Sequence, residues 1–335
     1  MGVNEHLAHL SNYLVYSAMA AYAVALIAFA VDLSGRGRVA TGVATVREKE
    51  LANVGGPALS GPGAGGTELP RASLAAGDQA GEKRQTVAMA VTVTYLAFAL
   101  HVAAVVCRGL SVERVPWGNM YEFSLAGSVV VTGVYLASLW RMDLRFLGTF
   151  VVGPVLLTLG LAVAVFYTDA AQLVPALQSF WLIIHVSVAF VASALFVMGF
   201  SLTVLQMVQD RRQSLTAAGK APTRGAFMDK LPAAEVLDRT SYRIYAVAFP
   251  LWTFTLMAGA IWAEKAWGRY WNWDPKEIWT FIIWVAYAAY LHARATRGWD
   301  RRAAYLACIA FFCLMFNWFG VNIFFSGLHS YAGIK

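Results

Sequence analysis

Long apolar runs alternate with shorter polar stretches along nearly the whole chain. The runs can be drawn at 11–33, 86–109, 122–140, 146–167, 181–208, 244–264, 277–296 and 303–325. Most of them reach the roughly 20 residues that an α-helix needs to cross the hydrocarbon core of a bilayer. Because a spanning segment must satisfy its own backbone polar groups, the pattern predicts an all-α, polytopic integral membrane protein with about eight transmembrane helices.

Composition and charge support this interpretation. The 335 residues are 59% hydrophobic and 13% charged, with a mean hydropathy of +0.56. The formal net charge of +7 could suggest nucleic acid, but 20 of the 26 lysines and arginines lie in the linkers after the first, third, fifth and seventh runs. The positive-inside rule then places these linkers in the cytoplasm and both termini outside. The charge reflects topology in a lipid bilayer, and no nucleic-acid partner is expected.

Three regions follow from this pattern. Residues 1–33 form an N-terminal transmembrane helix, and residues 34–84 are rich in glycine, alanine, proline and serine, which predicts a flexible cytoplasmic loop. Residues 85–335 form the main membrane domain. No two of the three cysteines, Cys107, Cys308 and Cys313, have the spacing of a Cys-x-x-Cys motif. Thiol redox chemistry is therefore not expected of this chain.

The most unusual stretch runs from residue 267 to 277, Trp-Gly-Arg-Tyr-Trp-Asn-Trp-Asp-Pro-Lys-Glu. It combines aromatic rings with cations and carboxylates, and the topology places it on the outer face. Tryptophan and tyrosine are common at membrane boundaries, so an aromatic belt is one interpretation. The other is a site for a flat, apolar and anionic ligand, because flat rings set among cations suit such a molecule.

Within this stretch, Trp271 and Trp273 alternate with Asn272, so their rings could cover one edge of a planar ligand. Lys265, Arg269 and Lys276 are available to pair with carboxylates on that ligand. Asp274 precedes a proline at the start of the seventh run, a position typical of a helix cap. We therefore expect Asp274 to begin a helix, and we assign it no proton transfer.

Histidines lie at several depths of the predicted membrane domain. His185 is about one turn inside the outer end of the fifth run, and His329 follows the outer end of the eighth run. His292 is in the inner half of the seventh run, and His101 is in the outer half of the second. Haem iron takes up to two imidazoles, whereas a membrane histidine often only bonds a neighbouring helix. The first interpretation is favoured for His185 and His329, the second for His101, and both stay open for His292.

The stretch from Trp267 to Glu277 resembles the WWD motif of the haem-handling protein family. With His185, His329, the eight runs and the turn at 116–123, the chain is similar to the CcsA/ResC branch (named CcsB in some bacteria) of system II cytochrome c biogenesis. The resemblance covers most of the chain from about residue 86 onward.

The resemblance implies a haem-transporting subunit of a holocytochrome c synthase (haem lyase type). Haem b would reach a WWD site on the extracytoplasmic face of the plasma membrane, where a ResB/CcsB-type partner helps attach it to the Cys-x-x-Cys-His motif of apocytochrome c. By residue match, His185 and His329 would be the outer axial iron ligands, and His292 an intramembrane ligand. Trp267, Trp271, Trp273, Arg269, Lys276 and Asp274 belong to the cofactor-binding motif. No catalytic residue is separate from the haem site.

Two other functions remain open from the sequence. A haem exporter or chaperone of the same superfamily would share the WWD stretch without synthase activity. A haem-b membrane anchor of an oxidoreductase would normally stack its histidine pairs at matched depths, which the positions of His185 and His329 do not favour. His101 is a second, less favoured candidate to oppose His292, from which it is separated by several helical turns in depth.

Overall fold

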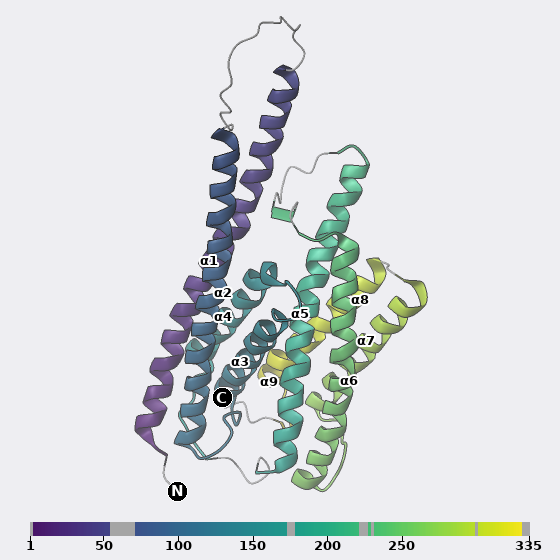
Figure 1. Cartoon of the computed structure of the whole chain (residues 1–335). Coiled ribbons are helices and arrows are strands. Elements are labelled where there is room, and N and C mark those ends of the chain that lie inside the picture. The colour runs from purple at the N-terminus through teal and green to yellow at the C-terminus, as the bar shows by residue number, and fades with distance from the viewer. Residues whose placement is uncertain are drawn as a thin grey trace, which may run out of the picture.

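The computed structural model describes residues 3–53, 71–172, 178–220, 227–228, 231–298 and 301–329, with side chains apart from those of 35–84. Regular structure in these ranges is helical (Figure 1). The α-helices are α1 (Glu5–Asn53), α2 (Arg71–Ser111), α3 (Met120–Ser138), α4 (Gly148–Ala164), α5 (Phe180–Ala217), α6 (Ala234–Trp267), α7 (Pro275–Arg297), α8 (Arg301–Met315) and α9 (Val321–Phe324). A 3₁₀ turn, η1 (Arg145–Leu147), precedes α4, and a π-helical turn, η4 (Phe316–Gly320), joins α8 to α9. The all-α prediction is confirmed.

Seven stretches of these described helices are long and apolar enough to cross a membrane, which makes this a multi-pass membrane protein. They are Glu5–Ser34, Gln85–Ser111, Met120–Ser138, Arg145–Ala164, Phe180–Ala217, Ala234–Trp267 and Arg301–Phe324. The predicted seventh span, 277–296, is a 23-residue helix, α7, but is not among them. Its tryptophans and tyrosines carry polar ring tips that lower the mean hydropathy. Its crossing of the membrane therefore remains a prediction.

The region 34–84 differs from the predicted loop. Helix α1 continues to Asn53 and α2 begins at Arg71, so both ends of this region are helical. Residues 48–52 are Glu-Lys-Glu-Leu-Ala, which are all good helix formers, and alanine recurs between residues 72 and 80. The loop was predicted from the glycine and proline content of the whole region, which hid the helix propensity at its two ends. Residues 54–70 lie outside the described part of the chain.

Helix α5 is the central element of the packing. It contacts α3 and α4 on one side and α6 and α8 on the other. Buried residues of α1–α5 and of the first part of α6 form one hydrophobic cluster, and those of α5–α8 form a second. A small third cluster, which includes Phe190 of α5 and Trp262 of α6, lies near the lower end of the view in Figure 1, where α5 begins and α6 ends.

The tryptophan-rich stretch forms the connection between α6 and α7. Gly268 ends α6 with φ +70°, a left-handed conformation that glycine adopts without a steric penalty. Asp274 caps α7 by accepting a hydrogen bond from the N–H of Lys276 at 3.1 Å, and Pro275 is the first residue of the helix. The predicted role of Asp274 as a helix-start residue is confirmed. These two ends hold the intervening loop against the end of the bundle.

Candidate functional site

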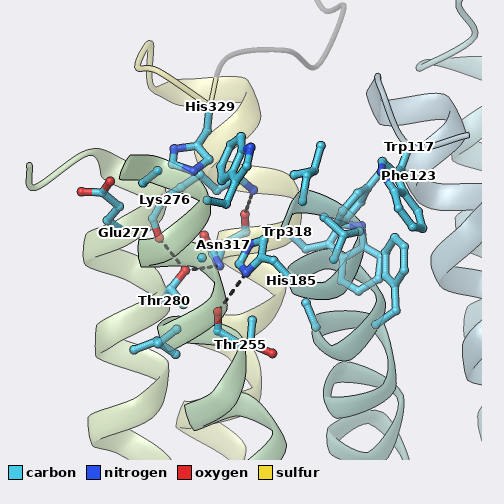
Figure 2. Close-up of a pocket in the computed structure, with 18 of the residues that line it drawn as sticks. Trp117, Phe123, His185, Thr255, Lys276, Glu277, Thr280, Asn317, Trp318 and His329 are labelled. Atoms are coloured by element: carbon cyan, nitrogen blue, oxygen red, sulfur yellow. Dashed lines mark hydrogen bonds between the residues drawn. The ribbon is translucent and has the colours of Figure 1, made fainter. Parts of the chain in front are cut away.

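An aromatic cavity of about 220 Å³ lies among α5, α6, the first turn of α7 and the π-helical turn. The turn before α3 closes its far side (Figure 2). His185, Lys276 and His329 line it. Its wall also carries the rings of Trp117, Phe123, Phe190, Trp252, Trp262, Tyr270, Trp271 and Trp318. The cavity therefore combines flat apolar surfaces with two imidazoles, the amino group of Lys276 and the carboxylate of Glu277.

His185 projects from α5 into this cavity. Its Nδ1 lies 2.9 Å from the carbonyl oxygen of Thr255 on α6 (Figure 2). Because a carbonyl only accepts, Nδ1 must carry the proton, and the lone pair lies on Nε2. This Nε2 makes no hydrogen bond with any residue that the structure describes. A backbone carbonyl that accepts the Nδ1 proton and so sets the tautomer is typical of a histidine that binds a metal.

His329 is anchored in the same manner by a carboxylate. Its Nδ1 donates to Oδ1 of Asp274 at 2.7 Å, and the N–H of Leu328 donates to Oδ2 at 2.7 Å. Burial raises the pKa of Asp274, but the hydrogen bond and charge of His329 and two backbone N–H groups outweigh it, so the pKa lies below its ordinary value. Nε2 of His329 is left for another ligand.

Trp262 brings the two histidines to one place. The His185 ring lies nearly parallel to its indole, with centroids 6.1 Å apart and 12° between planes. The His329 ring meets the same indole edge-on at 5.5 Å. Trp262 was missed in the sequence, although Thr255, Gly259 and Trp262 follow the helical spacing of one face. That spacing, applied to the sixth run, could have identified it.

The tryptophans of the motif have different positions. Trp271 lines the cavity, and Trp267 packs against His329 with ring centroids 5.0 Å apart. Trp273 is 66% exposed, does not line the cavity, and meets Trp271 edge-on at 5.7 Å. It adopts φ +60°, which is unusual for a bulky residue. In this structure one indole of the predicted pair, that of Trp271, forms part of the wall.

Glu277 closes the loop on itself. Its Oε2 accepts from the N–H groups of Asn272 at 2.8 Å and Asp274 at 3.1 Å, completing a capping box with Asp274. Its Oε1 lies 3.4 Å from Nη1 of Arg269, whose guanidinium also covers the Trp267 ring at 5.6 Å. Nη2 of Arg269 is buried and makes no hydrogen bond in the described part of the protein. Arg269 thus stabilises the loop and retains one spare donor.

Lys276 is the cation that reaches the cavity. Its Nζ donates to the carbonyl of Asn317 in the π-helical turn, and the structure describes no carboxylate paired with it (Figure 2). Burying an ammonium is costly, and Lys276 is partly buried with the charge of Asp274 nearby, so this side of the cavity suits an anionic group of a ligand. Lys265, by contrast, is exposed and lies 3.0 Å from Glu264, away from the cavity wall.

The other two membrane histidines lie elsewhere. His292 is exposed on α7 and does not line the cavity. His101 is fully buried, with its Nδ1 3.4 Å from the hydroxyl of Tyr22. Helix α2 packs against α1 and α3, whereas α7 packs against α6 and α8. This arrangement favours a structural role for His101 and does not favour His101 and His292 as a pair.

Sequence reasoning also missed residues from two other segments. Trp117 lies in the turn before α3 and Phe123 in the first turn of α3, within the polar–aromatic stretch 116–123 that was noted without a role in the site. Asn317 and Trp318 lie in a stretch that was predicted as an ordinary span. The π-helical turn there has no clear sequence signal, because it depends on packing against α7.

A bundle of membrane-crossing helices with an aromatic cavity and two anchored imidazoles defines a multi-pass membrane protein with a ligand site. The cytochrome c assembly protein family matches residues 117–329, which begin at Trp117 and end at His329 of this cavity. The chain belongs to this family and is of its CcsA type, with a role in cytochrome c biogenesis. Membership implies that it handles haem.

Several relatives carry the name cytochrome c biogenesis protein CcsA. The protein from a Picosynechococcus species is 33% identical over 278 residues, covering 67% of this chain and 82% of the relative. That from Synechococcus elongatus is 35% identical over 267 residues, covering 67% and 81%. That from Guillardia theta is 38% identical over 236 residues, covering 66% and 77%.

Proposed function

We propose that this chain carries haem b across the membrane and presents it in the aromatic cavity for attachment to apocytochrome c. The observation that carries this proposal is the pair His185 and His329. Both line one cavity, and both have Nδ1 held by an acceptor of the protein, which leaves Nε2 as the ring atom available to a ligand. Two such imidazoles are the ligand set of a low-spin haem iron.

The remaining wall fits the rest of the haem molecule. Trp262 and Trp271 supply flat apolar surface for the macrocycle. Lys276 supplies a cationic side chain for a propionate, and the spare Nη2 of Arg269 lies in the adjacent loop. Asp274 and Glu277 hold the loop that carries these groups, so a change in either carboxylate would disturb the site indirectly.

The protein's own contribution is to bind and orient. Haem, when bound, supplies the vinyl groups that react with the thiols of a Cys-x-x-Cys-His motif. His185 and His329 would hold the haem macrocycle in position, and the aromatic wall would keep water from it. The chain supplies no separate acid or base in this proposal, and the partner that completes the synthase is a ResB-type membrane subunit.

Topology supports the direction of transport. The positively charged linkers favour a cytoplasmic position for the end of the bundle where α5 ends and α6 begins, in a protein of the plasma membrane. The cavity then opens toward the extracytoplasmic face. His292, exposed on α7, is proposed to ligate haem during uptake, opposite a ligand from the partner subunit.

The test is co-expression with a ResB-type subunit and an apocytochrome carrying one Cys-x-x-Cys-His motif. The purified wild-type complex should show a bis-imidazole haem spectrum and should yield covalent cytochrome. His185→Ala and His329→Ala should each lose the bis-imidazole spectrum and covalent attachment. Trp140→Ala is the control, because Trp140 is 77% exposed and does not line the cavity.

Two results would contradict the proposal. An unchanged spectrum and unchanged attachment in both histidine variants would remove the assignment of the ligands. A wild-type complex that binds haem but never forms the covalent product, with the partner present, would favour the haem exporter or chaperone function.

A further inference from the structure

A buried ion cluster lies beside the cavity, at the ends of α2 and α3. Nε of Arg108 is 3.1 Å from Oε1 of Glu122, and their side chains are 1% and 0% exposed. Nη1 of Arg114 is 2.8 Å from Oε2 of the same carboxylate. Burying these charges is expensive, and removing one partner of such a cluster leaves the others uncompensated. No step of the proposed function uses these three residues.

The Glu122 carboxylate closes the turn that precedes α3. Besides both arginines, it accepts the N–H of Gly118 at 2.9 Å. The side chain of Asn119 in turn accepts the N–H of Glu122 at 2.9 Å as the N-cap of α3. Trp117, Gly118 and Asn119 all line the cavity. The conformation of this part of the wall therefore depends on a carboxylate that does not itself reach the cavity.

The same cluster holds a second outer segment. Nη2 of Arg108 donates to the carbonyl of Thr168 at 2.6 Å, and Nη2 of Arg114 donates to that of Ala171 at 2.6 Å. Both carbonyls belong to the connection between α4 and α5. Through the two arginines, the turn before α3 is hydrogen-bonded to the connection between α4 and α5, and its other side lines the cavity.

The turn supplies the wall opposite the tryptophan-rich loop. Figure 2 shows Trp117 and Phe123 on one side of the cavity and Lys276 and His329 on the other. Phe190 lies 6.1 Å from the Trp117 ring and 4.7 Å from the Phe123 ring. A shift of the turn would widen the cavity on this side without moving either histidine.

We propose that Glu122 is a positioning residue, which through Arg108, Arg114 and the N–H of Gly118 holds the Trp117 wall against a flat ligand in the cavity. That the ligand is haem rests on the proposed function. The role of Glu122 in holding the wall does not, since it follows from the hydrogen bonds of the protein alone.

The main experiment compares Glu122→Gln with Asp238→Asn in the full-length protein. Asp238 is a matched control, because it is a buried carboxylate that pairs with Arg294 through two guanidinium nitrogens but lies away from the cavity. Both variants should lower the melting temperature. Haem transfer to excess apomyoglobin should accelerate about tenfold in Glu122→Gln, a change that corresponds to about 1.4 kcal/mol in free energy. In Asp238→Asn it should accelerate less than about twofold.

A double-mutant cycle distinguishes positioning from general destabilisation. Trp117→Ala should accelerate haem release as Glu122→Gln does, and the two effects should not add, because both remove the same wall. If Glu122→Gln does not fold, Arg114→Lys, at a partly accessible position, replaces it and should give a smaller change in the same direction. Equal release rates in Glu122→Gln and Asp238→Asn, or additive effects with Trp117→Ala, would overturn the proposal.

A measurement without haem separates this proposal from the proposed function. Amide hydrogen exchange of residues 117–119 in the haem-free protein should accelerate in Glu122→Gln and stay unchanged in Asp238→Asn. Unchanged exchange of the turn in Glu122→Gln would refute the positioning role even if haem binds as proposed. Faster exchange in a protein that never binds haem would instead refute the proposed function and leave the positioning role supported.

Discussion

The carboxylate of Asp274 accepts hydrogen bonds from the N–H groups of Lys276 and Leu328 and from the imidazole of His329. One side chain therefore begins α7 and orients a candidate iron ligand. Gly327 fits beside it because a Cβ there would lie 2.4 Å from Oδ2 of Asp274. At the scale of single residues, the sequence does not separate the two roles of Asp274, which are to cap α7 and to orient His329. Substitutions can separate them.

Comparing Asp274→Ala with Asp274→Asn separates the capping of α7 from the orientation of His329. Alanine removes the cap and should lower the free energy of unfolding by about 1 kcal/mol, in addition to disturbing His329. Asparagine also caps helices, so Asp274→Asn should retain most of the stability while weakening the His329 signature in the haem spectrum. Thermal unfolding and Soret absorbance measure the two effects. Equal loss of the His329 signature and of stability in both variants would contradict the separation.

The lowered pKa of Asp274 also predicts a pH dependence. A carboxyl whose pKa is lowered on folding contributes stability that is complete above the ordinary value of about 3.9. That contribution is lost as the pH falls through the lowered folded value. On acidification below the ordinary carboxyl pKa, the melting temperature of the wild type should therefore fall more steeply than that of Asp274→Asn. Parallel curves for the two proteins would show that the pair with His329 contributes no stability.

At the scale of elements, the contact between α5 and α6 decides where His185 lies. A Cβ at Gly259 of α6 would lie 2.7 Å from Cε1 and 2.8 Å from Nδ1 of His185. The imidazole cannot move away without losing its bond to the Thr255 carbonyl. A glycine at this point of α6 is therefore required by the position of the neighbouring ring.

Gly259→Ala tests this packing with the smallest available change. It should lower the melting temperature and weaken axial ligation by His185, seen as loss of the bis-imidazole spectrum. Gly160→Ala in α4 is the matched control, since a Cβ there meets no atom within 4 Å. Alanine favours a helix by about 0.5–1 kcal/mol over glycine, so the control should be neutral or slightly more stable. A normal spectrum in Gly259→Ala would show that the interface relaxes around the new methyl group.

At the scale of the whole molecule, the two ends of the bundle differ. The aromatic cavity with His185 and His329 lies at one end, and His292 is exposed on α7 in the predicted inner half of the membrane. The proposed transport would therefore use two binding sites, of which the described part of the chain encloses one. An exposed histidine at the other end fits a ligand that is completed by a partner subunit.

His292→Ala should separate uptake from binding. Protein purified from cells should contain several-fold less haem than wild type, whereas haem added to the purified variant should bind in the cavity normally. Thr296→Ala, one turn further along α7 and also exposed, is the control. Normal haem content in cells would show that His292 takes no part in uptake, and weak binding of added haem would place its effect in the cavity instead.

Much of the fold could be predicted from the sequence because its signals are local. The length of each apolar run decides whether a helix can cross a bilayer, and Asp274 followed by Pro275 begins a helix wherever it occurs. His185 and His329 could be assigned to one level because each lies near the end of a predicted span. These inferences depend on a residue and its near neighbours in the chain, as does the resemblance of the tryptophan-rich stretch to a known motif.

Tertiary structure alone decided which members of the motif reach the cavity. Trp271 lines it and Trp273 does not, and Lys276 lines it while Lys265 pairs with Glu264 away from it. Trp262 meets His185 and His329, which come from segments far from it in the sequence. The physical reason is that a rotation or shift of one helix against another moves its side chains between the cavity and the surface, and this arrangement is set by the packing of all the helices together.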